Sequence, residues 1–233
     1  MNQIKFIEEL EKIGINLNEI QLEQLNQYYE LLIEYNKVMN LTGITEKEQV
    51  YLKHFYDSLT IIKVINLKKI NSLCDIGTGA GFPGLVIKIV FPNIKITLLD
   101  SLNKRIEFLN QVIKELKLEN IKTIHTRAEE YSIKNRNKFD ITTARAVAHL
   151  SILLEYAIPM TKINGYFIAL KGNVKEEIKE IENAIKELKL ELEKIVELNL
   201  PVEESNRTII SFKKLKDIKK YPRKNSEIKR QRL

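Results

Sequence analysis

The stretch Leu73-Cys74-Asp75-Ile76-Gly77-Thr78-Gly79-Ala80-Gly81-Phe82-Pro83-Gly84 decides how this chain folds. A short apolar run enters four glycines and then a helix-compatible segment, which is typical of a strand turning into a helix around a bound nucleoside or dinucleotide. Glycines suit such a turn because they lack a Cβ and so tolerate unusual dihedral angles and close approach of a ligand. Asp100 closes the next β-branched and leucine-rich run, residues 94–99, where a carboxylate accepts hydrogen bonds from ribose hydroxyls.

The same glycines fit two nucleotide-binding frames. Gly79, Gly81 and Gly84 form G-x-G-x-x-G, the dinucleotide fingerprint, with an acid about twenty residues further on. Gly77, Gly79 and Gly81 form G-x-G-x-G two residues after Asp75, and this frame resembles the first motif of class I methyltransferases, which bind S-adenosylmethionine. We favour the second frame because the acid before the first glycine belongs to that motif only. An NAD(P)-dependent oxidoreductase is the alternative.

The composition predicts a soluble protein without a metal centre. Of 233 residues, 44% are hydrophobic, and no apolar run approaches the length of a membrane span. Glu8 and Glu9 are unsuited to a signal peptide, so we expect a cytoplasmic protein. The single cysteine, Cys74, excludes an internal disulfide, and the three histidines lie too far apart in sequence for metal-ligand spacing. We expect Cys74 to be a small apolar residue of the first strand.

The positive charge is concentrated at the C-terminus. The net charge is +7, and residues 213–233 alone contain ten basic and two acidic residues, so the rest of the chain is close to neutral. Such a tail is typical of a polyanion contact, and a solvated lysine-rich tail is the alternative. The arginines favour the first interpretation because a guanidinium binds phosphate with paired hydrogen bonds. We expect removal of residues 213–233 to weaken RNA binding and to leave cofactor affinity unchanged.

The periodicity of apolar residues divides the chain into two regions. Residues 1–65 predict a helical extension, in which the capping-box spacing of Thr45 and Glu48 starts a further helix toward His54. Residues 66–233 form the second domain and end in the basic tail. Its strands are expected at residues 71–76, 94–99, 120–125, 138–143, 165–171, 194–199 and 207–213, and its helices at 84–91, 102–118, 148–161 and 174–192. The last helix is expected to bury a stripe of Ile178, Ile181, Ile185, Leu188 and Leu192.

This alternation predicts an α/β fold with a mostly parallel sheet covered on both faces. Only residues 200–206 join the final two strands, which is too short for the helical crossover that a parallel pair needs. One strand of that pair is therefore antiparallel. The pattern is that of a Rossmann-like class I S-adenosylmethionine-dependent methyltransferase, with a seven-stranded sheet whose last strand is antiparallel, and not of the six-stranded parallel dinucleotide fold.

Ligands of open α/β sheets bind beyond the carboxyl ends of the strands, so the residues that follow each strand are the candidate site. The first three strands are followed by residues 77–82, by residues 100–102 and by residues 126–130. In the last of these segments, Glu129 is placed to accept from an adenine amino group, while Ala128 leaves room beside the ring. A solvated loop acid is the alternative for Glu129.

Two basic residues follow the fourth and fifth strands. Arg145, between Ala144 and Ala146, has little nearby in sequence to pair with, so we expect a phosphate, a carboxylate or a base edge as its partner. A salt bridge to a loop acid is the alternative. Lys171 faces the same edge of the sheet and is placed to hold a phosphate, or else it only ends the strand in water.

Missing motifs narrow the reaction. Methylation at a base carbon usually needs a cysteine after the fourth or fifth strand, and methylation of an exocyclic amine usually uses a Pro-Pro loop; the chain has neither. The remaining acceptor is one that is already a free nucleophile, such as guanine N7. That atom has an unprotonated lone pair at neutral pH, so transfer needs alignment and no general base. A basic nucleic-acid-binding protein without catalysis is a further alternative.

Six blocks along the chain resemble the ribosomal RNA small subunit methyltransferase G family, also called glucose-inhibited division protein B. They are Asn40-Leu41-Thr42, His54-Phe55-Tyr56-Asp57-Ser58-Leu59, residues 75–84, Arg145-Ala146-Val147-Ala148, Lys171-Gly172 and Lys219-Lys220-Tyr221-Pro222-Arg223-Lys224. The resemblance implies methyl transfer from S-adenosylmethionine to N7 of one guanine in small-subunit (16S) ribosomal RNA, free or in a subunit assembly intermediate, by a protein that we expect to be a monomer. The chain departs from the family after Lys224, where Asn225-Ser226-Glu227-Ile228 replaces a segment with Gly and Pro.

The resemblance also implies roles for individual residues. The cofactor contacts are the motif glycines and the residues after the first four strands: Gly77, Gly79, Gly81, Phe82, Asp100, Ser101, Leu102, Ala128, Glu129 and Arg145. Arg145 is also expected to position the target base or its phosphate. The His54 block, otherwise a packing segment, would cover the cofactor. The expected RNA contacts are Lys171, Lys219, Lys220, Arg223, Lys224, Arg230 and Arg232.

Overall fold

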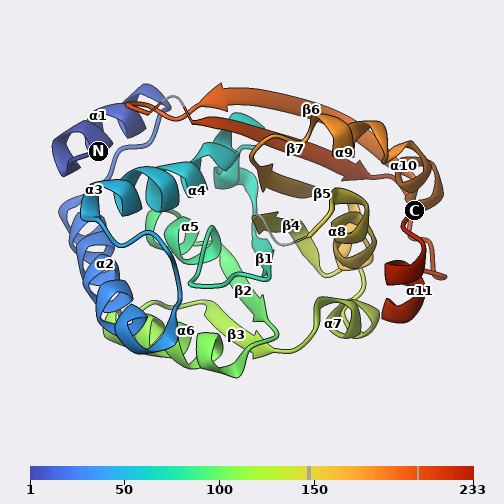
Figure 1. Ribbon diagram of the computed structural model, residues 1–233, viewed down its shortest axis with the longest axis horizontal. Helices are drawn as coiled ribbons and strands as arrows, with labels where there is room; N and C mark the ends of the chain where they lie inside the picture. The colour runs from blue at the N-terminus through green and yellow to red at the C-terminus, as the bar shows by residue number, and fades with distance from the viewer. Residues whose placement is uncertain (146–147, 204) are drawn as a thin grey trace.

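Seven strands form one sheet in the order β3-β2-β1-β4-β5-β7-β6 (Figure 1). The computed structural model describes residues 1–145, 148–203 and 205–233. The strands are β1 (Ser72–Ile76), β2 (Lys95–Asp100), β3 (Ile121–His125), β4 (Phe139–Arg145), β5 (Thr161–Lys171), β6 (Leu190–Asn199) and β7 (Asn206–Lys214). Strands β1 to β5 pair in parallel, and β7 runs antiparallel to both β5 and β6. The sheet confirms the expected class I methyltransferase topology with its antiparallel last strand.

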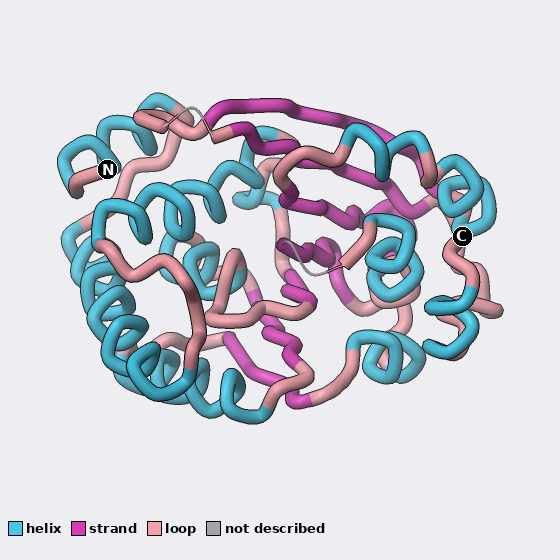
Figure 2. The backbone as a smooth tube through the Cα atoms, in the orientation of Figure 1, coloured by secondary structure: helices cyan, strands magenta, loops and turns pink. Residues whose placement is uncertain are grey.

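Helices cover both faces of the sheet (Figure 2), and each face has its own apolar core. One face carries α5 (Gly84–Val90) and α6 (Asn103–Glu115), and the other carries α7 (Ala128–Lys134), α8 (Leu150–Ala157), α9 (Lys175–Lys179) and α10 (Glu182–Leu188). Helix α11 (Asn225–Arg230) follows near the C-terminus. Cys74 of β1 is fully buried, as expected for a small apolar strand residue. In the described part of the chain, no helix combines the length and the apolar character needed to cross a bilayer.

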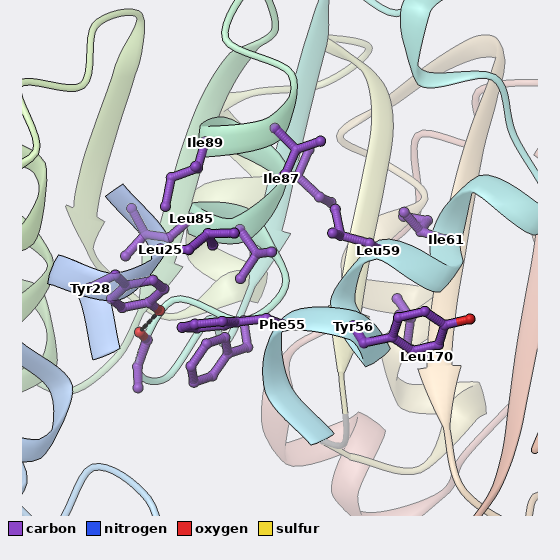
Figure 3. Packing of buried hydrophobic residues seen from close by; sticks show 14 of the residues in the cluster. Leu25, Tyr28, Phe55, Tyr56, Leu59, Ile61, Leu85, Ile87, Ile89 and Leu170 are labelled. Carbon is purple, nitrogen blue, oxygen red and sulfur yellow. Dashed lines mark hydrogen bonds between the residues drawn. The ribbon is translucent and has the colours of Figure 1, made fainter. Parts of the chain in front are cut away.

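The N-terminal extension packs onto the first of these faces. It contains α1 (Gln3–Lys12), α2 (Glu19–Met39), α3 (Lys47–Val50), a π-helical segment (Tyr51–Tyr56), α4 (Asp57–Leu59) and two 3₁₀ turns (Thr60–Lys63 and Leu67–Lys69). The Gln21 amide donates to the carbonyls of Ile89 and Val90 at the end of α5, both at 3.0 Å, and so supplies partners for carbonyls at that helix end. Leu25 and Tyr28 are buried in the same core as α5 (Figure 3).

Two of the expected helices differ in the structure. The helix toward His54 exists, but it begins at Lys47 after Glu46 without a side-chain cap, so Thr45 and Glu48 form no capping box. The expected helix 174–192 is two short helices, and the chain enters β6 at Leu190 after Lys189, whose φ is +52°. Leucine and glutamate alternate at residues 190–193, and pairing with β7 prevails over the helical spacing that reaches Leu192.

Two helices were not expected. Helix α7 begins at Ala128, directly after β3, and α11 lies within the basic tail. Both are short, at seven and six residues, and neither has an apolar stripe long enough to predict a helix. Their positions matter because the first residue of each lies at the candidate site.

Candidate functional site

The turn between β1 and α5 is held together by Asp75. Its carboxylate is fully buried, and Oδ2 accepts from the Thr78 hydroxyl at 2.6 Å and from the Gly84 amide at 2.8 Å. Burial raises the pKa of Asp75 to about 6, although these two hydrogen bonds favour the charged form. The acid that singled out the methyltransferase frame in the sequence therefore ties the strand to both ends of the glycine turn.

The glycines of this turn have different surroundings. Gly81 has a φ of +104°, and a Cβ there would lie 2.4 Å from Leu85 Cδ1 and 2.6 Å from the Tyr28 hydroxyl oxygen. That hydroxyl donates to the carbonyl of Ala80, so α2 supports the turn from the extension, with the Phe55 ring stacked on Tyr28 (Figure 3). A Cβ on Gly79 would meet no atom within 4 Å, and Gly79 lines an open cavity. The turn is therefore packed on one side and open on the other.

A first cavity of about 420 Å³ lies on this open side. Its wall combines the turn, the end of β2, the end of β4 and the N-terminal extension: Leu41, Thr42, His54, Gly77, Thr78, Gly79, Ala80, Phe82, Asp100, Ser101, Arg105 and Arg145. A second cavity of about 190 Å³ is lined by Ile76, Gly77, Leu99, Asp100, Ser101, Thr126, Arg127, Ala128, Glu129, Leu153, Tyr156 and Asn225. Gly77, Asp100 and Ser101 belong to both walls, so the two cavities adjoin along the carboxyl edge of β1 and β2.

Most of the cofactor residues expected from the sequence line this two-part cleft. Gly79, Phe82 and Arg145 line the first cavity, and Ala128 and Glu129 line the second. The remaining expected residues line both cavities: Gly77, Asp100 and Ser101. Gly81 and Leu102 line neither of these two cavities. Gly81 packs against Leu85 and Tyr28, and Leu102 precedes α6 with a 43% exposed side chain. Their expected cofactor contact has no support from these cavities.

Asp100 has a structural role in addition to the expected one. Its oxygens accept from the Gly79 amide and the Leu102 amide, both at 2.9 Å, and Arg105 Nη1 lies 3.3 Å from Oδ2. The carboxylate therefore fixes the turn to the end of β2. A carboxylate oxygen accepts more than one hydrogen bond, so these contacts leave capacity for a ribose hydroxyl, and that role stays a prediction.

Arg145 is paired within the protein, and a carboxylate is one of its partners. Its Nη1 donates to the Lys53 carbonyl at 3.0 Å and lies 3.4 Å from Asp57 Oδ2, while the guanidinium stands 4.9 Å from the centre of the Phe82 ring. The salt-bridge alternative is correct, but the acid comes from the extension, about ninety positions away in sequence, and not from a nearby loop. Arg207 of β7 binds the same Asp57 oxygen at 3.1 Å. No local pattern signals this cluster, because its members are distant along the chain.

His54 completes the wall of the first cavity as a neutral ring. It stacks on Phe82 with ring centres 4.4 Å apart; Nδ1 lies 3.2 Å from Arg145 Nη2, and Nε2 lies 2.9 Å from the Thr42 hydroxyl oxygen. Nδ1 also lies 3.1 Å from the Lys53 carbonyl oxygen, so it stands between the guanidinium donor of Arg145 and a backbone acceptor. Burial and the charge of Arg145 lower the pKa of His54 to about 3. Both ring nitrogens are therefore occupied at neutral pH.

Two of the expected RNA contacts are engaged within the protein. Lys171 is only 8% exposed, and its ammonium donates to the Ala148 carbonyl at 2.8 Å and to Glu177 at 2.6 Å. Arg223 binds the fully buried Glu155 through Nε at 2.9 Å and Nη2 at 2.7 Å. Acids on other elements therefore neutralise these two side chains, and their expected contact with phosphate gains no support from this geometry.

The other expected RNA contacts lie on the surface. Lys220 forms an exposed pair with Glu187 at 2.6 Å, and Arg232 lies 3.9 Å from Glu180. Lys219, Lys224 and Arg230 are exposed. Surface pairs of this kind contribute little stability, so Lys220 and Arg232 remain available to an anionic partner.

The basic tail is a docked segment and not a free one. Residues 213–214 belong to β7, where Lys214 is buried and donates to the Thr161 carbonyl at 2.9 Å and to Asp217 at 3.0 Å. Tyr221 and Ile228 are buried as well. Removing residues 213–233 would shorten β7 and take buried residues out of the core, so the deletion would disturb the fold as well as RNA binding. It is therefore not expected to leave cofactor affinity unchanged.

Comparison with known proteins assigns the family. A family model described as "rRNA small subunit methyltransferase G" matches residues 21–210. Proteins named ribosomal RNA small subunit methyltransferase G from Bacillus licheniformis and Lysinibacillus sphaericus are 52% and 50% identical over 228 residues; the match spans 96% of this chain and 95% and 96% of theirs. The Bacillus subtilis protein of the same name is 49% identical over 96% of this chain and 95% of its own.

Solved structures support the fold. An S-adenosylmethionine-dependent methyltransferase from Aquifex aeolicus aligns with a TM-score of 0.53 at 17% identity, over 72% of this chain and 93% of that one. A precorrin-6y C5,15-methyltransferase from Geobacter metallireducens aligns with a TM-score of 0.54 at 15% identity, over 76% and 92%. The sequence relatives, at about half identity over nearly the whole of both chains, go further: this chain belongs to the ribosomal RNA small subunit methyltransferase G family.

Proposed function

We propose that this protein transfers the methyl group of S-adenosylmethionine to N7 of one guanine in small-subunit (16S) ribosomal RNA. Its family membership gives the reaction class, the cofactor and the kind of RNA, and it decides between the two frames of the glycine motif. The two alternative functions, an NAD(P)-dependent oxidoreductase and a non-catalytic RNA-binding protein, are therefore rejected. The choice of N7 is carried by the chemistry of the first cavity.

The residues of the cleft fit the cofactor. The open space beside Gly79 accepts a ligand against the backbone, and Asp100, in both walls, lies where a ribose would connect the two cavities. We place the adenine in the second cavity beside Ala128 and Glu129, and the methionine part in the first. When bound there, the cofactor supplies an electrophilic methyl group on a sulfonium ion.

The first cavity offers no free general base among the described residues of its wall. His54 is neutral, and both of its nitrogens have partners, while Asp100 is held by backbone amides and its remaining capacity is assigned to the cofactor ribose. Such a site lacks a group to remove the proton from an acceptor that must be deprotonated before methylation. Guanine N7 needs only to be held in line with the methyl group, because its lone pair is free at neutral pH. This absence of a free base is the observation that supports N7.

Arg145 and Phe82 are the residues best placed to hold the target. The guanidinium is fixed by the Lys53 carbonyl and Asp57, and it lies over the Phe82 ring at the cavity wall. A fixed cation beside an aromatic face suits a base edge or its phosphate. The exposed side chains of Lys219, Lys220, Lys224, Arg230 and Arg232 then contact phosphates further from the site.

Both parts of the cleft are built from one chain, which supports a monomer as the active unit. The transfer that we propose needs no resident metal, since the sulfonium already activates the methyl group. We also place the protein in the bacterial cytoplasm, where small-subunit RNA is made and assembled.

The test uses purified protein, labelled S-adenosylmethionine and small-subunit RNA from cells that lack this modification, both as naked RNA and as assembled subunits. We expect label in guanosine after nuclease digestion. Calorimetry with S-adenosylhomocysteine and with NAD(P) checks the cofactor independently. Label on protein, label on another nucleoside, or binding of NAD(P) alone would reject the proposal.

A further inference from the structure

The second cavity has one wall that comes from the C-terminal segment. Asn225, the first residue of α11, lines it together with Leu153 and Tyr156 of α8. Helix α11 lies beside α7 and α8 (Figure 1), and α7 begins with Ala128 and Glu129 at the same cavity. Three helices thus meet where we place the adenine ring.

The side chain of Asn225 is oriented by a specific contact. The Tyr156 hydroxyl donates to Asn225 Oδ1 at 2.9 Å. With its oxygen engaged in this way, the amide has its Nδ2 group left as a hydrogen-bond donor. A half-buried amide with one atom fixed has fewer rotamers to lose when it binds a ligand.

The backbone before Asn225 is anchored by the buried ion pair of Arg223 and Glu155. Glu155 accepts from the Arg223 amide at 2.8 Å as well as from two guanidinium nitrogens, and Glu155 is fully buried on α8. On the other side of Asn225, Ile228 is completely buried. The segment is therefore held on both sides of the residue that faces the cavity.

From this arrangement we infer that Asn225 is a cofactor-binding residue at the adenine end, with Tyr156 as its positioning residue. An adenine ring presents ring nitrogens that accept and an amino group that donates. The Asn225 amide supplies a donor for a ring nitrogen, opposite the Glu129 carboxylate that accepts from the amino group. The inference rests on the proposed function for the identity of the cofactor.

The test measures binding of two ligands by calorimetry. S-adenosylhomocysteine carries both halves of the cofactor, and 5′-methylthioadenosine carries the adenine and ribose without the amino acid. Asn225→Ala should raise Kd for both ligands by the same factor, about 3- to 10-fold for a lost hydrogen bond. Tyr156→Phe should raise Kd for both by a smaller factor. Ser226→Ala, at a neighbour on the same helix that does not line the cavity, should stay within about twofold of wild type.

Asn225→Asp separates cofactor binding from a structural role. It keeps an oxygen for the Tyr156 hydroxyl and suits the first turn of a helix, but it lacks the amide donor. We expect it to bind both ligands at least as weakly as Asn225→Ala while its thermal midpoint stays at or above that of wild type. Wild-type affinity of Asn225→Asp, or a loss confined to S-adenosylhomocysteine, would overturn the inference. Failure of unmodified protein to bind S-adenosylhomocysteine would instead reject the proposed function.

Discussion

Alanine at two glycines of the β1–α5 turn should separate cofactor binding from folding. Gly79 has a φ of +61°, and a Cβ added there would have no atom within 4 Å, so Gly79→Ala meets only the left-handed backbone penalty, about 1–2 kcal/mol. At Gly81 the φ is +104°, and the added methyl would meet Leu85 and Tyr28 at 2.4 and 2.6 Å. Overpacking there adds about 1–3 kcal/mol to the backbone penalty.

Thermal unfolding and calorimetry with S-adenosylhomocysteine measure the two effects. Since 1 kcal/mol corresponds to about 2–4 °C for a chain of this size, the melting temperature should fall by about 2–8 °C for Gly79→Ala and by about 4–20 °C for Gly81→Ala. Gly79→Ala should nevertheless bind the ligand about tenfold more weakly or worse, because its methyl enters the first cavity. Gly172→Ala, with no atom within 4 Å, is the control. Wild-type affinity of Gly79→Ala, or equal stability of the two variants, would refute this reasoning.

Three further predictions concern charge. Burial and Arg145 lower the pKa of His54 to about 3, so only the unfolded chain takes up this proton as the pH falls below about 6.5, and native stability decreases. Between pH 7 and 5.5, wild type should lose about 1 kcal/mol more free energy of unfolding than His54→Gln, and equal pH profiles of the two proteins would contradict this. Burial raises the pKa of Asp75 to about 6, so Asp75 stabilises the native state as the pH falls. Both proteins contain Asp75, so the comparison cancels its contribution. Arg223→Ala leaves Glu155 buried without its cation and should cost about 2–3 kcal/mol in denaturant unfolding, whereas the exposed Lys224→Ala should cost less than about 0.5; similar losses would argue against the ion pair. A triple alanine variant of the exposed Lys219, Lys224 and Arg230 should bind RNA more weakly, with a salt dependence reduced by about two counterions and an unchanged Kd for S-adenosylhomocysteine. An unchanged salt dependence would exclude these three residues as RNA contacts.

The sheet and the glycine turn could be predicted because their signals are local. Asp75 and the glycines lie within ten positions of one another, and the short link before β7 restricts the direction of the last strand pair. Helix α7 and the end of α10 could not be predicted, because short helices depend on their packing and β6 is decided by its pairing with β7.

The partners of the site's charged residues could not be predicted for a related reason. Arg145 meets Asp57, and Arg223 meets Glu155, across 88 and 68 positions of sequence. Nothing in the local sequence marks a lysine or arginine as paired when its acid arrives from another element. Asn225 could not be predicted as a site residue for the same reason, because it lines the second cavity only through docking of the C-terminal segment on α8, 69 positions from Tyr156 in sequence.

The most direct test of the central claim locates the methyl group on the RNA. Small-subunit RNA from a strain lacking the family's enzyme is incubated with this protein and S-adenosylmethionine, then treated with borohydride and aniline, which cleave RNA at N7-methylguanosine. Primer extension reads the cleavage sites. We predict one new stop at a single guanine, absent without cofactor and strongly reduced with Arg145→Ala. Methylated RNA without a cleavage site, or cleavage scattered over many guanines, would contradict transfer to N7 of one guanine.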